Sequence, residues 1–197
     1  MDQVEELLWR DPLIKGMWCV PEYSNLSGIV HSDTTVKRIA KLGNIASNSF
    51  RIFWDNAYAV HHLVDVPPQL TNIIDLSEEY GTLDNVYVIG STSKITFAGA
   101  GMAFLASSEK NIKKLADHLS YVTTGPDKLN QLRQVRFLKD KRNIDNHMAF
   151  QRAILKPKFE LVLKHLNEAL ADHIINAKPI GLHPKADTLF RLIPKKG

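Results

Sequence analysis

Three apolar runs in this chain are each followed by polar side chains that could take part in chemistry. The runs are "GMWCV" (16–20), "FRIFWD" (50–55) and "VYVIG" (86–90), each with the composition of a buried β-strand. The third is followed at once by "STSK", and a lysine is costly to bury unless something is bonded to it. The candidate side chains are an amide, a carboxylate, a phenol, two hydroxyls and an amine: Asn25, Asp55, Tyr58, Ser91, Ser93 and Lys94.

This set of side chains suits pyridoxal 5'-phosphate (PLP). That cofactor needs a lysine for its imine, an acid against its pyridine nitrogen, and donors for its phenolic O3' and its phosphate. A carboxylate near the pyridine nitrogen favours the protonated ring, which is the stronger electron sink for a carbanion at the substrate's Cα. Taken singly, Asp55 is typical of a turn acid, Tyr58 of a packing residue and Lys94 of a solvated lysine, so the hypothesis depends on the whole set.

The candidate side chains can meet only if the three strands are parallel neighbours. Hydrophobic spacing and capping residues predict helices between and after them, and a fourth strand at 101–107. The order strand–helix–strand–helix–strand predicts an α/β fold, a mostly parallel sheet with flanking helices. In such sheets ligands bind outside the carboxyl ends of the strands. The expected helices cover 2–10, 32–42, 67–81, 108–122, 125–140 and 145–172.

The chain is expected to form one domain followed by a long helix and a tail. Residues 1–145 contain no linker, 146–172 form a long helix that leaves this domain or bridges to another, and 173–197 show three prolines and no lasting period. Pro157 inside the long helix predicts a kink or a break there. The tail is therefore expected to be irregular.

Composition excludes several classes of function. The 197 residues carry a net charge of +4 without a basic stripe interleaved with aromatics, which disfavours nucleic acid. No run is apolar enough for a membrane span or a signal peptide, and the single cysteine, Cys19, suits a reducing cytoplasm. No metal is expected, because adjacent His61 and His62 would point about 100° apart on a helix. Core positions are expected for the three tryptophans: Trp9, Trp18 and Trp54.

Three short motifs resemble the signatures of fold-type-I, class I aminotransferases, the relatives of aspartate aminotransferase. These are "YSNLSG", "DNAY" and "STSK". Longer runs are similar to a bacterial subgroup with MocR-like aminotransferase domains: "KGMWCVPEYSN", "FRIFWDNAYAVHHL" and "GSTSKITFAGAG". The resemblance covers about residues 1–170 and implies a partial PLP-binding large domain. It also implies transamination between an amino acid and a 2-oxo acid, and a homodimer in the parent family.

The resemblance gives each candidate residue a role. Lys94 forms the internal aldimine and is the implied catalytic residue, and Asp55 pairs with the pyridine nitrogen. Tyr58 and Asn25 hydrogen-bond O3', and Asn25 also meets the substrate carboxylate. The implied phosphate contacts are the hydroxyls of Ser91 and Ser93.

Departures from the family pattern keep a second interpretation open. "NLSG" replaces the family's "NPTG", and Met102 or Ala103 stands near the place of its phosphate-binding arginine. The chain also has about half the length of a family member. The alternative is a truncated, catalytically impaired relative, acting as a non-enzymatic fragment or as one part of a split enzyme. A small nucleotide-binding α/β domain is disfavoured, because no GxGxxG or P-loop follows a strand.

Overall fold

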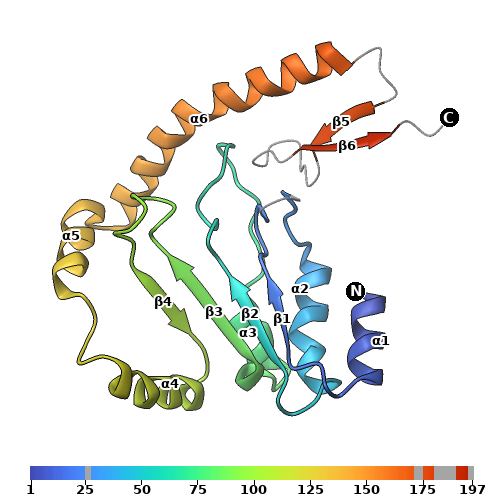
Figure 1. Ribbon diagram of the computed structural model, residues 1–197, viewed down its shortest axis with the longest axis vertical. Coiled ribbons are helices and arrows are strands. Elements are labelled where there is room, and N and C mark those ends of the chain that lie inside the picture. The colour runs from blue at the N-terminus through green and yellow to red at the C-terminus, as the bar shows by residue number, and fades with distance from the viewer. Residues whose placement is uncertain (25–27, 171–174, 180–189, 195–197) are drawn as a thin grey trace. The chain divides into compact units, whose positions relative to one another are not determined.

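The computed structural model describes residues 1–24, 28–170, 175–179 and 190–194 (Figure 1). It divides into two compact units, Met1–Val20 with His31–Ala57 and Gln69–Gln134, and Pro21–Val30 with Tyr58–Pro68 and Val135–Gly197. The helices are α1 (Asp2–Arg10), α2 (Asp33–Ala40), α3 (Ile73–Glu79), α4 (Glu109–Val122), α5 (Lys128–Leu138) and α6 (Lys141–Leu170), with short 3₁₀ turns at Lys41–Asn44 and Leu83–Asn85. The strands are β1 (Gly16–Cys19), β2 (Arg51–Asp55), β3 (Val86–Ser91), β4 (Ala103–Ala106), β5 (Ile175–Pro179) and β6 (Phe190–Pro194).

The first unit contains a four-stranded sheet in the order β1-β2-β3-β4. The first three strands are parallel, and their register aligns Trp18 with Phe53 and Phe53 with Tyr87. β4 pairs antiparallel with β3, so that Ile89 lies opposite Leu105. The expected α/β fold with a mostly parallel sheet is therefore confirmed.

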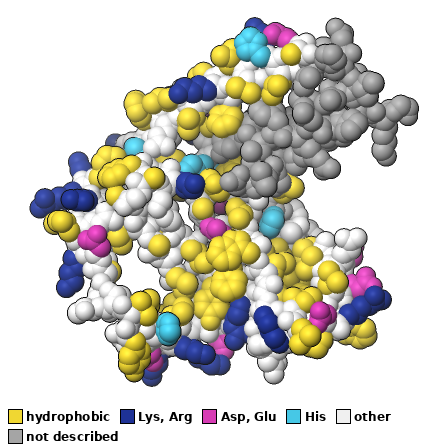
Figure 2. Space-filling view, viewed as in Figure 1, with side chains coloured by type: hydrophobic (Ala, Val, Ile, Leu, Met, Phe, Trp, Pro, Cys, Tyr) yellow, Lys and Arg dark blue, Asp and Glu magenta, His cyan; other side chains and the backbone are white. Residues whose placement is uncertain are grey.

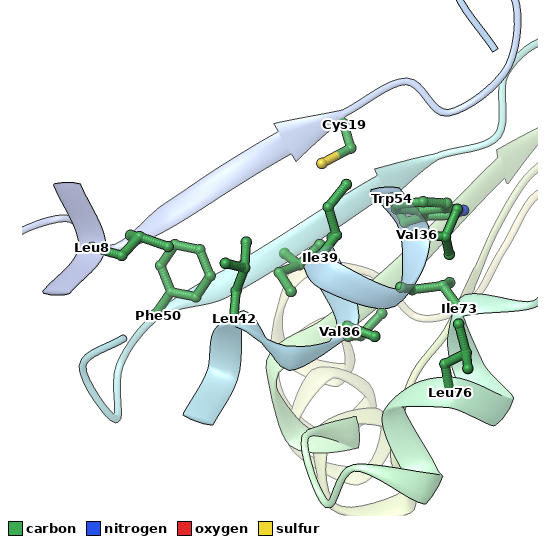
Figure 3. Packing of buried hydrophobic residues seen from close by; sticks show 12 residues of the cluster. Leu8, Cys19, Val36, Ile39, Leu42, Phe50, Trp54, Ile73, Leu76 and Val86 are labelled. Carbon is green, nitrogen blue, oxygen red and sulfur yellow. The ribbon is translucent and has the colours of Figure 1, made fainter. Parts of the chain in front are cut away.

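The hydrophobic core lies on one face of this sheet. Side chains alternate along a strand, so Ile52 and Trp54 of β2 are buried while Phe53 and Asp55 point to the opposite face. Helices α2 and α3 supply the other half of the core (Figure 3). The labelled core side chains are Leu8, Cys19, Val36, Ile39, Leu42, Phe50, Trp54, Ile73, Leu76 and Val86.

Polar caps set where the helices begin. Ser32 accepts a hydrogen bond from the backbone N–H of Thr35 at the start of α2, and Ser108 caps α4 in the same way, as the sequence predicts. The predicted helix start at residue 67 is wrong. α3 begins at Ile73, where the side chain of Asn72 accepts a hydrogen bond from the N–H of Ile74. The two prolines therefore precede the helix instead of opening it.

The second unit contains α6 and a pair of antiparallel strands. α6 continues through Pro157 instead of ending there. β5 pairs with β6, although the sequence analysis expects an irregular tail over 173–197. Pro179 and Pro194 are the last residues of these strands, where a missing N–H disturbs the ladder least. None of the described helices combines the length and apolar character that crossing a membrane requires.

Candidate functional site

The sheet brings two of the predicted functional segments to one edge. Asp55 is the last residue of β2 and is paired in register with Ile89 of the parallel neighbour β3. β3 ends at Ser91, and Lys94 follows in the turn just beyond it. Asp55 is half-buried and Lys94 is exposed. The carboxyl edge of the sheet thus carries an acid from one strand and an amine from the turn after its neighbour.

The carboxylate of Asp55 is held by neutral donors. The indole N–H of Trp18 donates to Oδ2 at 3.2 Å, and the backbone N–H of Ala57 donates to Oδ1 at 3.1 Å. These two hydrogen bonds fix the position of the carboxylate, and within the described part of the chain Asp55 takes part in no salt bridge. This edge therefore offers a carboxylate to a ligand with cationic or N–H groups.

Trp18 belongs to this edge, although its apolar run predicts a core position. Its side chain lies on the face opposite the core, so 60% of its surface is exposed. Trp9 is likewise exposed, and only Trp54 of the three tryptophans is buried. The signal that could have located Trp18 is its place in the neighbouring strand, on the same face as Asp55 and near the same edge.

The turn that carries Lys94 is braced by the segment before β4. Ser91 donates from its hydroxyl to that of Ser93 at 2.9 Å and accepts from the backbone N–H of Ser93. Thr92 exchanges two hydrogen bonds with Met102, both 2.8 Å long. A Cβ at Gly101 would lie 1.9 Å from the Ser93 hydroxyl, so only glycine fits there. Gly101 therefore packs directly against the turn that contains Ser93 and helps to hold this turn in place.

For the two remaining predicted residues, Tyr58 and Asn25, the structure gives no test of a place at this edge. Tyr58 belongs to the second unit, where its ring packs edge-on against His61 with centroids 5.5 Å apart. Its role at O3' stays a prediction, and Asn25 lies outside the described residues. In the same unit His62 is hydrogen-bonded through Nδ1 to the Tyr23 hydroxyl at 2.6 Å, and burial lowers the pKa of His62. Among the described residues no group of histidine, cysteine and carboxylate side chains could hold a metal.

Glu22, which precedes the predicted Asn25 motif, gives a pH-dependent prediction. Only 8% of this residue is exposed, and burial raises its pKa to about 7. Because the pKa is raised in the folded state, folding favours the protonated carboxyl group. The contribution of Glu22 to the free energy of unfolding is therefore fully present below the ordinary carboxyl pKa of 4.5 and is lost as the pH rises through about 7. We expect Glu22→Gln to raise the free energy of unfolding at pH 8 by roughly 1–2 kcal/mol and to leave it nearly unchanged at pH 5, measured by urea denaturation. An equal effect at both pH values would contradict this expectation.

Comparison with known proteins places this arrangement in context. The family model of aspartate aminotransferase matches residues 1–181. The chain is 40% identical over 173 residues to an aspartate aminotransferase of Corynebacterium glutamicum, covering 88% of this chain and 40% of that protein. A crystal structure of an aspartate transaminase from the same species superposes with a TM-score of 0.85 at 39% identity, covering 91% of this chain and 42% of the structure.

More distant structures share the fold alone. The α-aminoadipate aminotransferase of Thermus thermophilus, complexed with N-(5'-phosphopyridoxyl)-L-leucine, gives a TM-score of 0.70 at 19% identity. The chain spans about two fifths of the length of the curated relatives it matches. This share agrees with the expectation of a partial aminotransferase domain.

Proposed function

The chain belongs to the aspartate aminotransferase family, and from this premise we propose that it supplies the cofactor-binding edge of a PLP-dependent transaminase. The reaction would move an amino group between an amino acid and a 2-oxo acid, as in the aspartate aminotransferase of Corynebacterium glutamicum that it resembles. The observation that carries the proposal is the parallel pairing of β2 with β3, which sets Asp55 and the Lys94 turn at one edge of the sheet.

The chemistry of the side chains fits the cofactor. When bound, PLP supplies an electron sink for the carbanion that forms at the substrate's Cα. The carboxylate of Asp55 is held in place by two hydrogen bonds, and it would hold a proton at the pyridine nitrogen through a charge-assisted hydrogen bond. Lys94 would hold the cofactor covalently through its ε-amino group. Once the substrate's own amine has displaced it, the freed ε-amine would move the proton at the substrate's Cα. Ser91 and Ser93 would donate to the phosphate, at the cost of their mutual hydrogen bond.

Titration with the cofactor tests this proposal. We expect the purified full chain to develop a yellow absorbance band when PLP is added, and borohydride to abolish it. Transamination between aspartate and 2-oxoglutarate is then assayed on the same sample. If no band forms at saturating PLP, the proposal is wrong for this chain.

A second candidate function follows from the length of the chain. It spans about two fifths of the length of its curated relatives, so more than half of each relative has no counterpart in the sequence at hand. The alternative is a catalytically impaired relative, either non-enzymatic or one part of a split enzyme. A PLP band without transamination would support it, and we expect this chain to transaminate poorly by itself.

The MocR-like subgroup, the homodimer and the cytoplasmic location stay predictions.

Trp18 gives a prediction on cofactor affinity. Trp18→Phe keeps an aromatic ring on the sheet but removes the indole N–H that orients Asp55. A single hydrogen bond to a partly exposed carboxylate contributes about 1 kcal/mol, so we expect the Kd for PLP to rise about fivefold. The Kd is measured by absorbance titration, which does not depend on turnover. Phe53→Leu, on the same face without a bond to Asp55, is the matched control, and an equal loss in both variants would contradict an orienting role.

A further inference from the structure

The turn that carries Lys94 is closed by a single carbonyl group. The carbonyl oxygen of Thr92 accepts hydrogen bonds from the backbone N–H groups of Ile95 and Thr96, at 3.1 and 3.0 Å, and from the Thr96 hydroxyl at 2.9 Å. Residues 92–96, here called the lysine turn, thus form one hydrogen-bonded turn. A single turn is unfavourable by itself, because it fixes several backbone dihedrals for few hydrogen bonds. The conformation of the lysine turn therefore depends on contacts with other segments.

One such contact comes from a buried polar side chain on α5. Gln134 is only 6% exposed, whereas its neighbours in the chain, Arg133 and Val135, are exposed. Figure 2 shows basic and hydrophobic side chains at the surface around α5. A glutamine is rarely buried unless its amide group is hydrogen-bonded, because an unpaired amide is costly to remove from water. The partners of this amide therefore indicate why a glutamine stands here.

The amide of Gln134 donates to the segment that contains and follows the lysine turn. Its Nε2 donates to the carbonyl oxygen of Ala100 at 2.6 Å and to the Thr96 hydroxyl at 3.4 Å. One helical turn earlier, Nδ2 of Asn130 donates to the carbonyl oxygen of Gly101 at 3.3 Å. All of these residues belong to the first unit, and Figure 1 shows α5 beside the segment between β3 and β4. Two amides of one helix thus hold both ends of this segment.

The segment between the lysine turn and β4 has little means of holding itself. Residues 97–101, "FAGAG", carry one side chain larger than a methyl group, and that side chain, Phe97, is 62% exposed. Gly99 has a positive φ of 83°, and glycine loses more backbone entropy on ordering than any other residue. The segment must nevertheless stay ordered, since Gly101 packs against Ser93 of the lysine turn. The amide groups of α5 supply the order that the segment lacks.

We propose that Gln134 is a positioning residue for Lys94, and that its hydrogen bonds keep the lysine turn in the conformation that captures the cofactor. In that capture the ε-amine of Lys94 adds to the aldehyde carbon of PLP, and one water leaves as the C–N double bond forms. The amine must approach that carbon in a set direction, so only molecules with an ordered turn can react. The apparent Kd equals the intrinsic Kd divided by the ordered fraction. This inference rests on the proposed function and deepens it.

Gln134→Leu tests the proposal, because leucine fills a similar volume and cannot donate a hydrogen bond. Loss of one neutral hydrogen bond lowers the ordered fraction about fivefold, and the second bond is long, so we expect the Kd for PLP to rise roughly tenfold. Gln131→Leu is the matched control on α5, since the half-buried Gln131 side chain makes no hydrogen bond to residues 96–101 within the described part of the chain. It should leave the Kd unchanged. Urea denaturation checks each fold, and should Gln134→Leu fail to fold, Asn130→Leu should raise the Kd about twofold.

Gln134→Glu adds a measurement that a merely structural role would not move. An ionised carboxylate cannot donate to the Ala100 carbonyl, whereas a protonated carboxyl group can. Burial favours the protonated form, so the ratio of the variant's Kd to that of the unchanged chain should fall toward one between about pH 8.5 and about pH 6. Taking the ratio at each pH cancels the protonation of Lys94 itself. A weakened variant whose ratio is the same at every pH would show that the donated hydrogen bond is not what positions the turn.

Hydrogen exchange separates failure of this inference from failure of the proposed function. Without PLP, the backbone N–H groups of Ile95 and Thr96 report the order of the lysine turn directly. We expect them to exchange roughly tenfold faster in Gln134→Leu and at the unchanged rate in Gln131→Leu. A PLP band with the same Kd and the same exchange rates in every variant would overturn the inference and leave the proposed function intact. No band in the unchanged chain, with faster exchange in Gln134→Leu, would overturn the proposed function and support the role of Gln134 in ordering the turn.

Discussion

Lys94→Ala is expected to abolish covalent capture of PLP by this chain completely. The ε-amino group is the nucleophile that the cofactor's aldehyde requires, and alanine provides none. Lys94 is exposed in a turn, and urea denaturation of the variant checks that the chain stays folded. The measurement is the absorbance band with PLP, followed by borohydride reduction and mass spectrometry, which should find the phosphopyridoxyl mass on the peptide that contains residue 94.

Two variants control for charge and for non-specific lysine chemistry. Lys94→Arg keeps a positive charge in the same turn but cannot form the covalent bond, so it should also show no band. Lys37→Ala, on the exposed side of α2, should bind PLP like the unchanged chain. Persistence of the band in Lys94→Ala, or phosphopyridoxyl mass on another lysine, would show that the assignment is wrong.

The sequence predicts the elements that carry this turn because their signals are local. Ser32 and Ser108 sit directly before amphipathic runs, and both cap helices as expected. The apolar run of β3 is short and ends in glycine, which marks the strand and the start of the "STSK" turn. The parallel order of β1, β2 and β3 follows from the helices between them, so the shared edge of Asp55 and Lys94 is also predictable.

Features that depend on long-range packing are not readable in the same way. Trp18 was expected in the core, since an apolar run gives no sign of which face of a strand will be covered. Its hydrogen bond to Asp55 joins residues 37 positions apart and depends on which face of β1 the core leaves exposed. Proline at 67 and 68 suggests a helix start, yet the Asn72 side chain sets the observed one. The pairing of β5 with β6 involves short strands that end in proline and carry no period.

Asp55→Asn is expected to weaken PLP binding about 10- to 100-fold while the chain stays folded. Asparagine keeps the shape of the side chain and can still accept one hydrogen bond from Trp18 or from the Ala57 N–H, but it removes the charge. A hydrogen bond to an ionised group contributes about 1.5–3 kcal/mol, which corresponds to that range of affinity. The Kd for PLP is measured by absorbance titration, and urea denaturation checks the fold.

The outcome depends on whether the carboxylate acts on the ring nitrogen or only on the turn after β2. If Asp55 were only a turn acid that fixes Ala57, Asp55→Asn would leave the Kd for PLP unchanged, because the amide oxygen can replace that hydrogen bond. Asp55→Ala removes both the negative charge and the hydrogen bond from the Ala57 N–H. If Asp55 were only a turn acid, this variant should lower the free energy of unfolding without a selective loss of PLP binding. Asp75→Asn, an exposed acid on α3, controls for the change in net charge. A loss of affinity in Asp55→Asn, absent in Asp75→Asn and free of any loss of stability, therefore places the negative charge of Asp55 at the cofactor.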